Sequence, residues 1–267
     1  MSSPGASSVA LHHLPLRRRI AGLVWGRRFW WLLVAVGLIW GMTHGLGPLV
    51  VPLAVLGWIG AAALQAWTQS LRRQFLREAQ MPRFLAQKLC AAYPDLRPRD
   101  ADLVLHGLRQ FFIAHSRSGH RFVAMPSRIV DSAWHEFILH TQGYQRWCQI
   151  AFGRMLHHAP AEVLGKDPKR NDGLRRSWFW ACKEESIDPR KPARLPLLFA
   201  LDAKFAVAGG FLYQPDCSDV DRAAGSGVHC GSDFGGNGGG SGDADGFGGS
   251  DSAGGDGDSG GCGGGGD

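Results

Sequence analysis

The sequence predicts an all-α protein that consists of a two-helix transmembrane hairpin, a helical cytoplasmic domain and a disordered glycine-rich tail. Residues 29–67 contain no Asp, Glu, Lys or Arg, apolar residues recur at helical spacing through residues 68–222, and about half of the residues after Ala224 are glycine. No convincing run of alternating apolar and polar residues, the pattern of a strand, is present. We therefore divide the chain into a basic N-terminal segment (1–28), a hairpin (29–67), a helical domain (68–222) and a tail (223–267).

The chain has a basic body and an acidic tail. Its 267 residues carry a formal net charge of +6, and no Lys or Arg follows Arg222. A basic surface binds nucleic acid or anionic lipid. The charge-free segment makes the lipid bilayer the simpler partner, and nucleic acid is the less favoured one. The tail is too rich in Gly, Asp and Ser to bury a core, which predicts disorder.

Residues 29–67 are long enough for two membrane spans, because one span needs about 20 apolar residues. The turn is expected at residues 44–48, with spans at 29–44 and 48–67. Arginines flank both outer ends, and the turn has none. The positive-inside rule then places both termini in the cytoplasm and the protein in the inner membrane. A buried hairpin and a signal peptide are the alternatives, which the length of the charge-free run and the missing cleavage site disfavour.

The domain is expected to begin with a basic helix that continues from the hairpin and is interrupted at Met81 and Pro82. Apolar spacing predicts further helices at residues 99–116, 127–142, 144–156, 171–186 and 197–208. Gly143 separates or kinks the two central helices, and Gly209 follows the last one. A domain of this size can bury its own core.

The segment from Met125 to Pro160 concentrates the reactive side chains of the domain. Ser127 is a suitable N-cap for the helix that follows it, and Asp131 suits the positive end of the helix dipole. Asp131 and His135 are spaced i, i+4, so a carboxylate and an imidazole project from one helix face.

The same segment contains the run VDSAWHEFIL at residues 130–139, followed by Thr141, Tyr144, Cys148, Gly153 and the sequence HHAP at 157–160. This pattern resembles the glycine-rich domain-containing protein family (GRDP-like), whose motif is close to VDxxWHxxILxTxxYxxFC followed by a glycine and HHxP. The resemblance is close over residues 125–160 and looser over 81–217. It implies a helical domain that is found in bacteria and, in plants, in proteins with glycine-rich tails. Together with the predicted hairpin, this makes the chain a bacterial, membrane-anchored member. Family members often have a second histidine where this chain has Phe137, and Trp147 stands where the motif has Phe.

Five side chains in this segment are candidate ligands for a divalent, zinc-like metal ion: Asp131, His135, Cys148, His157 and His158. A shared site requires the two helices to fold back on each other, because His135 and Cys148 would point to different sides of a straight helix. In a second interpretation a structural polar core consists of Trp134, His135, Tyr144 and Cys148, with His135 bonded to Asp131 or to a buried carbonyl. His157 and His158 then lie at a helix C-terminus, where the dipole favours an imidazolium. In a third, Cys148 is a nucleophile with a histidine base that Asp131 orients. The six cysteines lack a CxxC spacing and are expected to be free thiols in the cytoplasm.

Two functions from different classes are consistent with these patterns. The first is an interaction or scaffold module that contacts a protein partner through Trp134, Tyr144 and Trp147. The alternative is a metal-dependent or thiol enzyme that uses the five candidate ligands. The chain contains no Walker, Rossmann, HExxH or GxSxG motif, so the sequence indicates no cofactor other than a possible metal. Exposed aromatic side chains would favour the interaction module, whereas converging polar groups would favour the enzyme.

Overall fold

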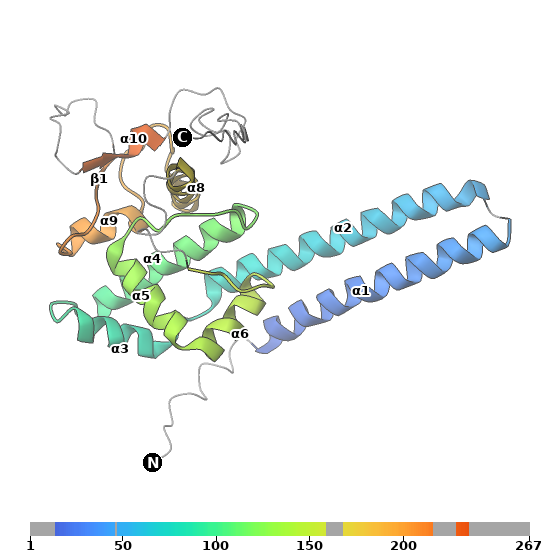
Figure 1. Cartoon of the computed structure of the whole chain (residues 1–267), viewed down its shortest axis with the longest axis horizontal. Helices are drawn as coiled ribbons and strands as arrows, with labels where there is room; N and C mark the ends of the chain where they lie inside the picture. Colours follow the sequence, from blue (N-terminus) through green and yellow to red (C-terminus); the bar gives the residue numbers. More distant parts are fainter. Residues whose placement is uncertain (1–13, 46, 159–167, 216–227, 235–267) are drawn as a thin grey trace, which may run out of the picture.

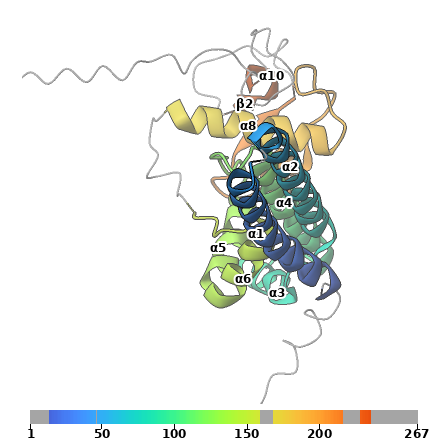
Figure 2. The ribbon, with the colours of Figure 1, turned by 90° about the vertical axis from the view of Figure 1, so that its right-hand side faces the viewer.

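A long helical hairpin projects from a helical domain in the computed structural model, which describes residues 14–45, 47–158, 168–215 and 228–234 (Figure 1). The hairpin consists of α1 (Leu14–Thr43) and α2 (Gly47–Glu78). These two helices run antiparallel and lie side by side in two perpendicular views (Figures 1 and 2). The described chain is mostly helical, which confirms the predicted fold class at this level.

The two helices of the hairpin approach each other closely at two glycines of α2. A Cβ atom on Gly57 would lie 2.8 Å from the side chain of Val34, and one on Gly60 would lie 2.4 Å from the ring of Trp30. Trp30 also donates a hydrogen bond from its indole Nε1 to the carbonyl oxygen of Gly57 at 2.8 Å. Small residues that allow close backbone contact are typical of helix pairs in membranes.

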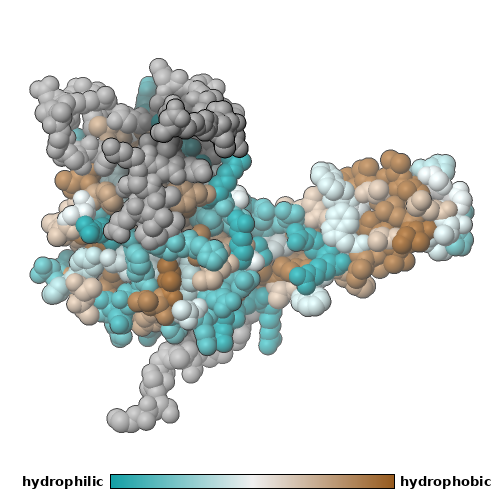
Figure 3. Space-filling view, in the orientation of Figure 1, coloured by the Kyte–Doolittle hydropathy of each residue, from teal (hydrophilic) through white to brown (hydrophobic). Residues whose placement is uncertain are grey.

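Most apolar side chains of the hairpin face outwards. Leu16–Thr43 and Gly47–Glu78 are both long and apolar enough to cross a membrane, and 0% and 11% of their apolar windows are buried. Apolar surface covers much of the projecting hairpin, up to its paler tip (Figure 3). The helices are longer than the predicted spans, because α2 continues without a break beyond Trp67 and carries Arg72, Arg73 and Arg77 towards the domain.

The long helix α4 (Pro98–Arg117) lies at the centre of the domain and packs against its neighbours on several sides. These neighbours are the end of α2, α3 (Arg83–Ala92), α5 (Arg128–Leu139), α8 (Pro168–Glu184) and α9 (Leu197–Lys204). Phe111 and Phe112 of α4 are buried and contact the ring of Trp134 from α5. As predicted, the chain leaves α2 before Met81 and Pro82 and resumes a helix after them.

The central pair of helices, α5 and α6 (Thr141–Ala151), breaks earlier than predicted. The break falls at His140, whose φ of −83° and ψ of 60° are not helical, whereas Gly143 lies inside α6. A Cβ atom on Gly143 would lie 2.2 Å from the His140 ring, so the glycine makes room for the ring that ends α5. The second helix ends at Ala151 and not near residue 156, because Gly153 adopts a φ of +78° that stops it.

A short parallel strand pair is the exception to the predicted all-α fold. β1 (Leu212–Gln214) pairs with β2 (Val228–Cys230), which leads into α10 (Gly231–Phe234). Phe234 lies close to the rings of Trp178, Phe199 and Tyr213. Residues 228–234, which follow the predicted domain end at residue 222, thus pack against the domain through this aromatic contact. The expected disorder of residues 235–267 lies outside the described residues.

The described cysteines include both free thiols and a disulfide-bonded residue. Cys90, Cys148 and Cys182 are free, whereas Cys230 is disulfide-bonded. The expectation of free thiols was therefore wrong for Cys230, because it rested on the expected compartment and not on the geometry around β2.

Candidate metal centre

The first turn of α5 is fixed by a carboxylate from a distant part of the chain. Asp202 of α9 accepts hydrogen bonds from the Ser127 hydroxyl (2.7 Å) and from the backbone N–H groups of Arg128 (2.7 Å) and Ile129 (3.1 Å). It also accepts one from the N–H of Phe211 (2.9 Å), and only 2% of the residue is exposed. Ser127 is the N-cap of α5, as predicted, and accepts a bond from Val130. A carboxylate at this position satisfies free N–H groups and complements the positive end of the helix.

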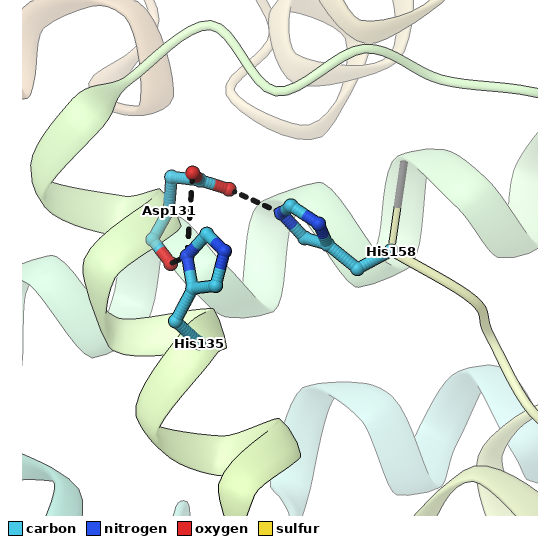
Figure 4. Close-up of side chains that lie close together, drawn as sticks. All are labelled: Asp131, His135 and His158. Carbon is cyan, nitrogen blue, oxygen red and sulfur yellow. Dashed lines mark hydrogen bonds and ion pairs between the residues drawn. The ribbon is translucent and has the colours of Figure 1, made fainter. Parts of the chain in front are cut away.

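Asp131, in that first turn, lies between two histidines (Figure 4). His158, from the segment that follows α6, places its Nε2 2.9 Å from Asp131 Oδ1. His135, one turn further along α5, places its Nδ1 3.4 Å from Asp131 Oδ2 and 2.9 Å from the Asp131 carbonyl oxygen. The i, i+4 spacing predicted from the sequence thus brings the carboxylate and the first imidazole together.

The two histidines differ in how firmly they are held. The side chain of His158 is 11% exposed and packs edge-on against the Trp134 ring, with ring centroids 4.6 Å apart. The side chain of His135 is 52% exposed, and its ring lies 4.3 Å from that of His158. One side of the centre is therefore anchored in the core and the other is open to solvent.

A chain of hydrogen bonds holds the segment that carries His158. The Trp134 indole donates to the Tyr144 hydroxyl at 3.0 Å, and this hydroxyl donates to the carbonyl oxygen of Leu156 at 2.6 Å. Because Leu156 lies two residues before His158, these bonds tie the segment to α5 and α6. Trp134 and Tyr144 thus have a structural role next to the centre, as in the second interpretation of the sequence.

The donor atoms of Asp131, His135 and His158 all lie within 4.8 Å of one another, which suits a single metal ion. Two imidazole nitrogens and a carboxylate oxygen are common ligands of zinc and of similar divalent transition metals. A zinc ion held by three protein ligands keeps a fourth position for water or substrate. Bound there, it would supply a Lewis acid that polarises an oxygen or lowers the pKa of bound water.

Two of the five predicted ligands lie outside this group. Cys148 is fully buried in α6, one helical turn after Tyr144. Burial raises the pKa of the Cys148 thiol, and the neighbouring Leu156 backbone and Tyr144 hydroxyl only partly offset this rise. Cys148 therefore lies apart from the three converging donors, and burial of its thiol disfavours the nucleophilic role. His157 is exposed and is not among the three converging residues.

The aromatic residues expected to form an interaction surface are buried. Trp134, Tyr144 and Trp147 are 4%, 0% and 8% exposed. The Trp147 ring packs against those of Phe112 and Phe137, within the core around α4. The interaction surface predicted from these three residues was therefore wrong, because the helical phase of α5 and α6 turns them inwards.

Comparison with curated proteins and with solved structures gave no match. Residues 71–234 match the model of one family, described as UCP032817-like. The resemblance to the glycine-rich domain-containing family was therefore wrong. Many residues of that motif, including Val130, Trp134, Tyr144 and Cys148, are buried packing positions, a kind of pattern that different helical domains can share. The match covers more than half of the chain and ends at Phe234, and on this basis the protein belongs to the UCP032817-like family.

Proposed function

We propose that this protein is a membrane-anchored protein that binds a zinc-like divalent metal ion through Asp131, His135 and His158. The observation that carries the proposal is the convergence of one carboxylate and two imidazoles within 4.8 Å. The chemistry of these donors and the open side of the centre support it.

A coordination position left to water or substrate is typical of catalytic zinc sites, whereas structural sites are closed by four protein ligands. We therefore favour an exchangeable or catalytic metal over a purely structural one. The proposal keeps the metal dependence of the predicted enzyme but does not include Cys148 among the metal ligands. The interaction module has less support, because the three aromatic residues assigned to it are buried.

Adjacent histidines provide a matched test of the site. His158→Ala is expected to lower the affinity of the full chain for zinc at least about 100-fold, because it removes a metal ligand. Loss of a residue that only hydrogen-bonds to a ligand already lowers metal affinity about 10- to 100-fold. His157→Ala removes a neighbouring exposed imidazole and is expected to leave the affinity within about twofold of the parent. Isothermal titration of the purified full chain in detergent with Zn²⁺ measures both. Equal affinities in the two variants would reject the site.

We also propose that α1 and α2 span the inner membrane, with both termini and the domain on the cytoplasmic side. The exposed apolar surface of the hairpin supports the span, and the arginines at its outer ends support the orientation. The disulfide at Cys230 is unusual for a cytoplasmic domain, which makes a direct test necessary. In spheroplasts, a cysteine introduced by His44→Cys at the turn is expected to react with a membrane-impermeant maleimide. Reaction only after permeabilisation would reverse the orientation.

A further inference from the structure

A second group of polar side chains lines an open pocket where the hairpin joins the domain. Its volume is about 430 Å³, and its lining residues come from α2, from the C-terminal end of α4 and from α8: Ser70, Arg73, Gln74, Arg77, Glu78, Arg117 and Trp180. The residues of α2 recur at intervals of three and four, so they share one face of that helix. No residue of the candidate metal centre lines this pocket.

The pocket has an excess of positive charge. Three arginines line it, and Glu184 pairs with two of them: Arg77 Nε lies 2.8 Å from Oε1, and Arg117 Nη2 lies 3.3 Å from Oε2. Glu78 is the other carboxylate at the pocket. Arg73 has no hydrogen bond or ion pair within the described part of the chain, so its charge is available to a ligand.

The side chain of Arg117 is less exposed than that of Arg77, 25% against 50%. Its guanidinium stacks over the Trp180 ring, 5.3 Å from the centroid. Burial lowers the pKa of Arg117; Glu184 opposes this shift, while Arg77 and Arg73 add to it through repulsion. In the described residues, Arg117 Nε and Trp180 Nε1 are buried donors without an acceptor. A further negative charge in the pocket would relieve the repulsion among these guanidinium groups.

The pocket lies just outside the apolar part of α2. Trp67, the last residue of the charge-free segment, is 59% exposed and suits the aromatic belt at a membrane surface. Arg73 follows it by six residues, which is roughly 9 Å along a helix. The headgroup layer adds roughly 5–7 Å on each side of the hydrocarbon core. A long arginine side chain in this position reaches the level of lipid phosphates.

We propose that this pocket binds a phosphate group, supplied either by the headgroup of an anionic phospholipid or by free phosphate. The planar guanidinium donates paired hydrogen bonds that match phosphate oxygens, and Arg73 and Arg117 approach the pocket from two different helices. This inference stands independently of the metal centre.

Native mass spectrometry of the full chain, released from maltoside micelles doped with phosphatidylglycerol or phosphatidylcholine, tests the lipid source. We expect preferential retention of phosphatidylglycerol and a drop of about fivefold on Arg73→Ala, the amount typical of one basic residue at a membrane surface. Arg73 makes no contact that folding needs, so this variant reports on binding. Arg99→Ala, at the opposite end of α4 from Arg117, removes an equal charge and is expected to change nothing.

Titration of the same samples with inorganic phosphate tests the other source. Binding of phosphate that depends on Arg73, without preference for phosphatidylglycerol, would assign the pocket to free phosphate. Retention of phosphatidylglycerol that Arg73→Ala and Arg99→Ala reduce equally, or no binding of either ligand, would overturn the proposal.

Discussion

Substitution of Asp202 by alanine is expected to destabilise the domain by about 3 kcal/mol or more, because hydrogen bonds to charged groups contribute roughly 1.5–3 kcal/mol each. The variant leaves the Ser127 hydroxyl and the N–H groups of Arg128, Ile129 and Phe211 without their acceptor. These donors lie at the start of α5 or beside it, where water has little access. For a chain of this size, the loss corresponds to a fall in melting temperature of roughly 6–12 °C.

Thermal unfolding of the full chain in detergent, followed by circular dichroism, measures this effect. Asp102→Ala is the matched control, because Asp102 is an exposed carboxylate on α4. Exposed substitutions usually change stability by less than about 0.5 kcal/mol. A melting temperature that falls equally in both variants would show that Asp202 does not anchor α5.

Substitution of Asp131 by asparagine is expected to lower zinc affinity at least about 100-fold, more than the loss of an outer-shell group typically does. The amide has nearly the same shape but no negative charge, and it replaces the group that contacts both histidines. Because the Asp131 side chain is 31% exposed, we expect the variant to fold. Titration of the full chain with Zn²⁺ gives the ratio of dissociation constants.

Glu136→Gln is the control that distinguishes the loss of a metal ligand from the loss of a negative charge. Glu136 lies next to His135 on α5 and is outside the group of three donors. Among the residues that the structure describes, its one ion pair is a long contact with Lys88 at 3.8 Å. Glu136→Gln removes one negative charge from α5, as Asp131→Asn does. If both variants weaken zinc binding to the same degree, Asp131 acts through the general field and not as a ligand.

Local rules were sufficient to predict part of the centre. The N-cap at Ser127 and the shared face of Asp131 and His135 depend on spacing within one helix, which the sequence displays directly. The helical hairpin was similarly evident, because a charge-free run of this length is long enough for two apolar helices joined by a turn. The choice between His157 and His158 could not be made, since it depends on the irregular segment after α6.

Longer-range packing decided the remaining features. Cys148 shares a helix face with Tyr144, which packs against Trp134 and Phe137 of α5, and its thiol is buried away from the three converging donors. Asp202 lies more than 70 residues after Ser127. No local sequence pattern therefore predicts that its carboxylate accepts hydrogen bonds from the start of α5. The phosphate pocket combines α2, α4 and α8 in the same way, and only the fold brings Arg73 near Arg117.

The cobalt(II) absorption spectrum of the purified full chain is the most direct test of the proposed metal centre. Cobalt(II) replaces zinc in such sites, and its visible bands report the number and type of ligands. We predict saturation at one cobalt per chain, with bands of nitrogen and oxygen ligation, no thiolate charge-transfer band, and loss of the spectrum in His158→Ala but not in His157→Ala. A spectrum of hydrated cobalt alone, or a thiolate band from Cys148, would contradict the assignment of Asp131, His135 and His158 as the metal ligands.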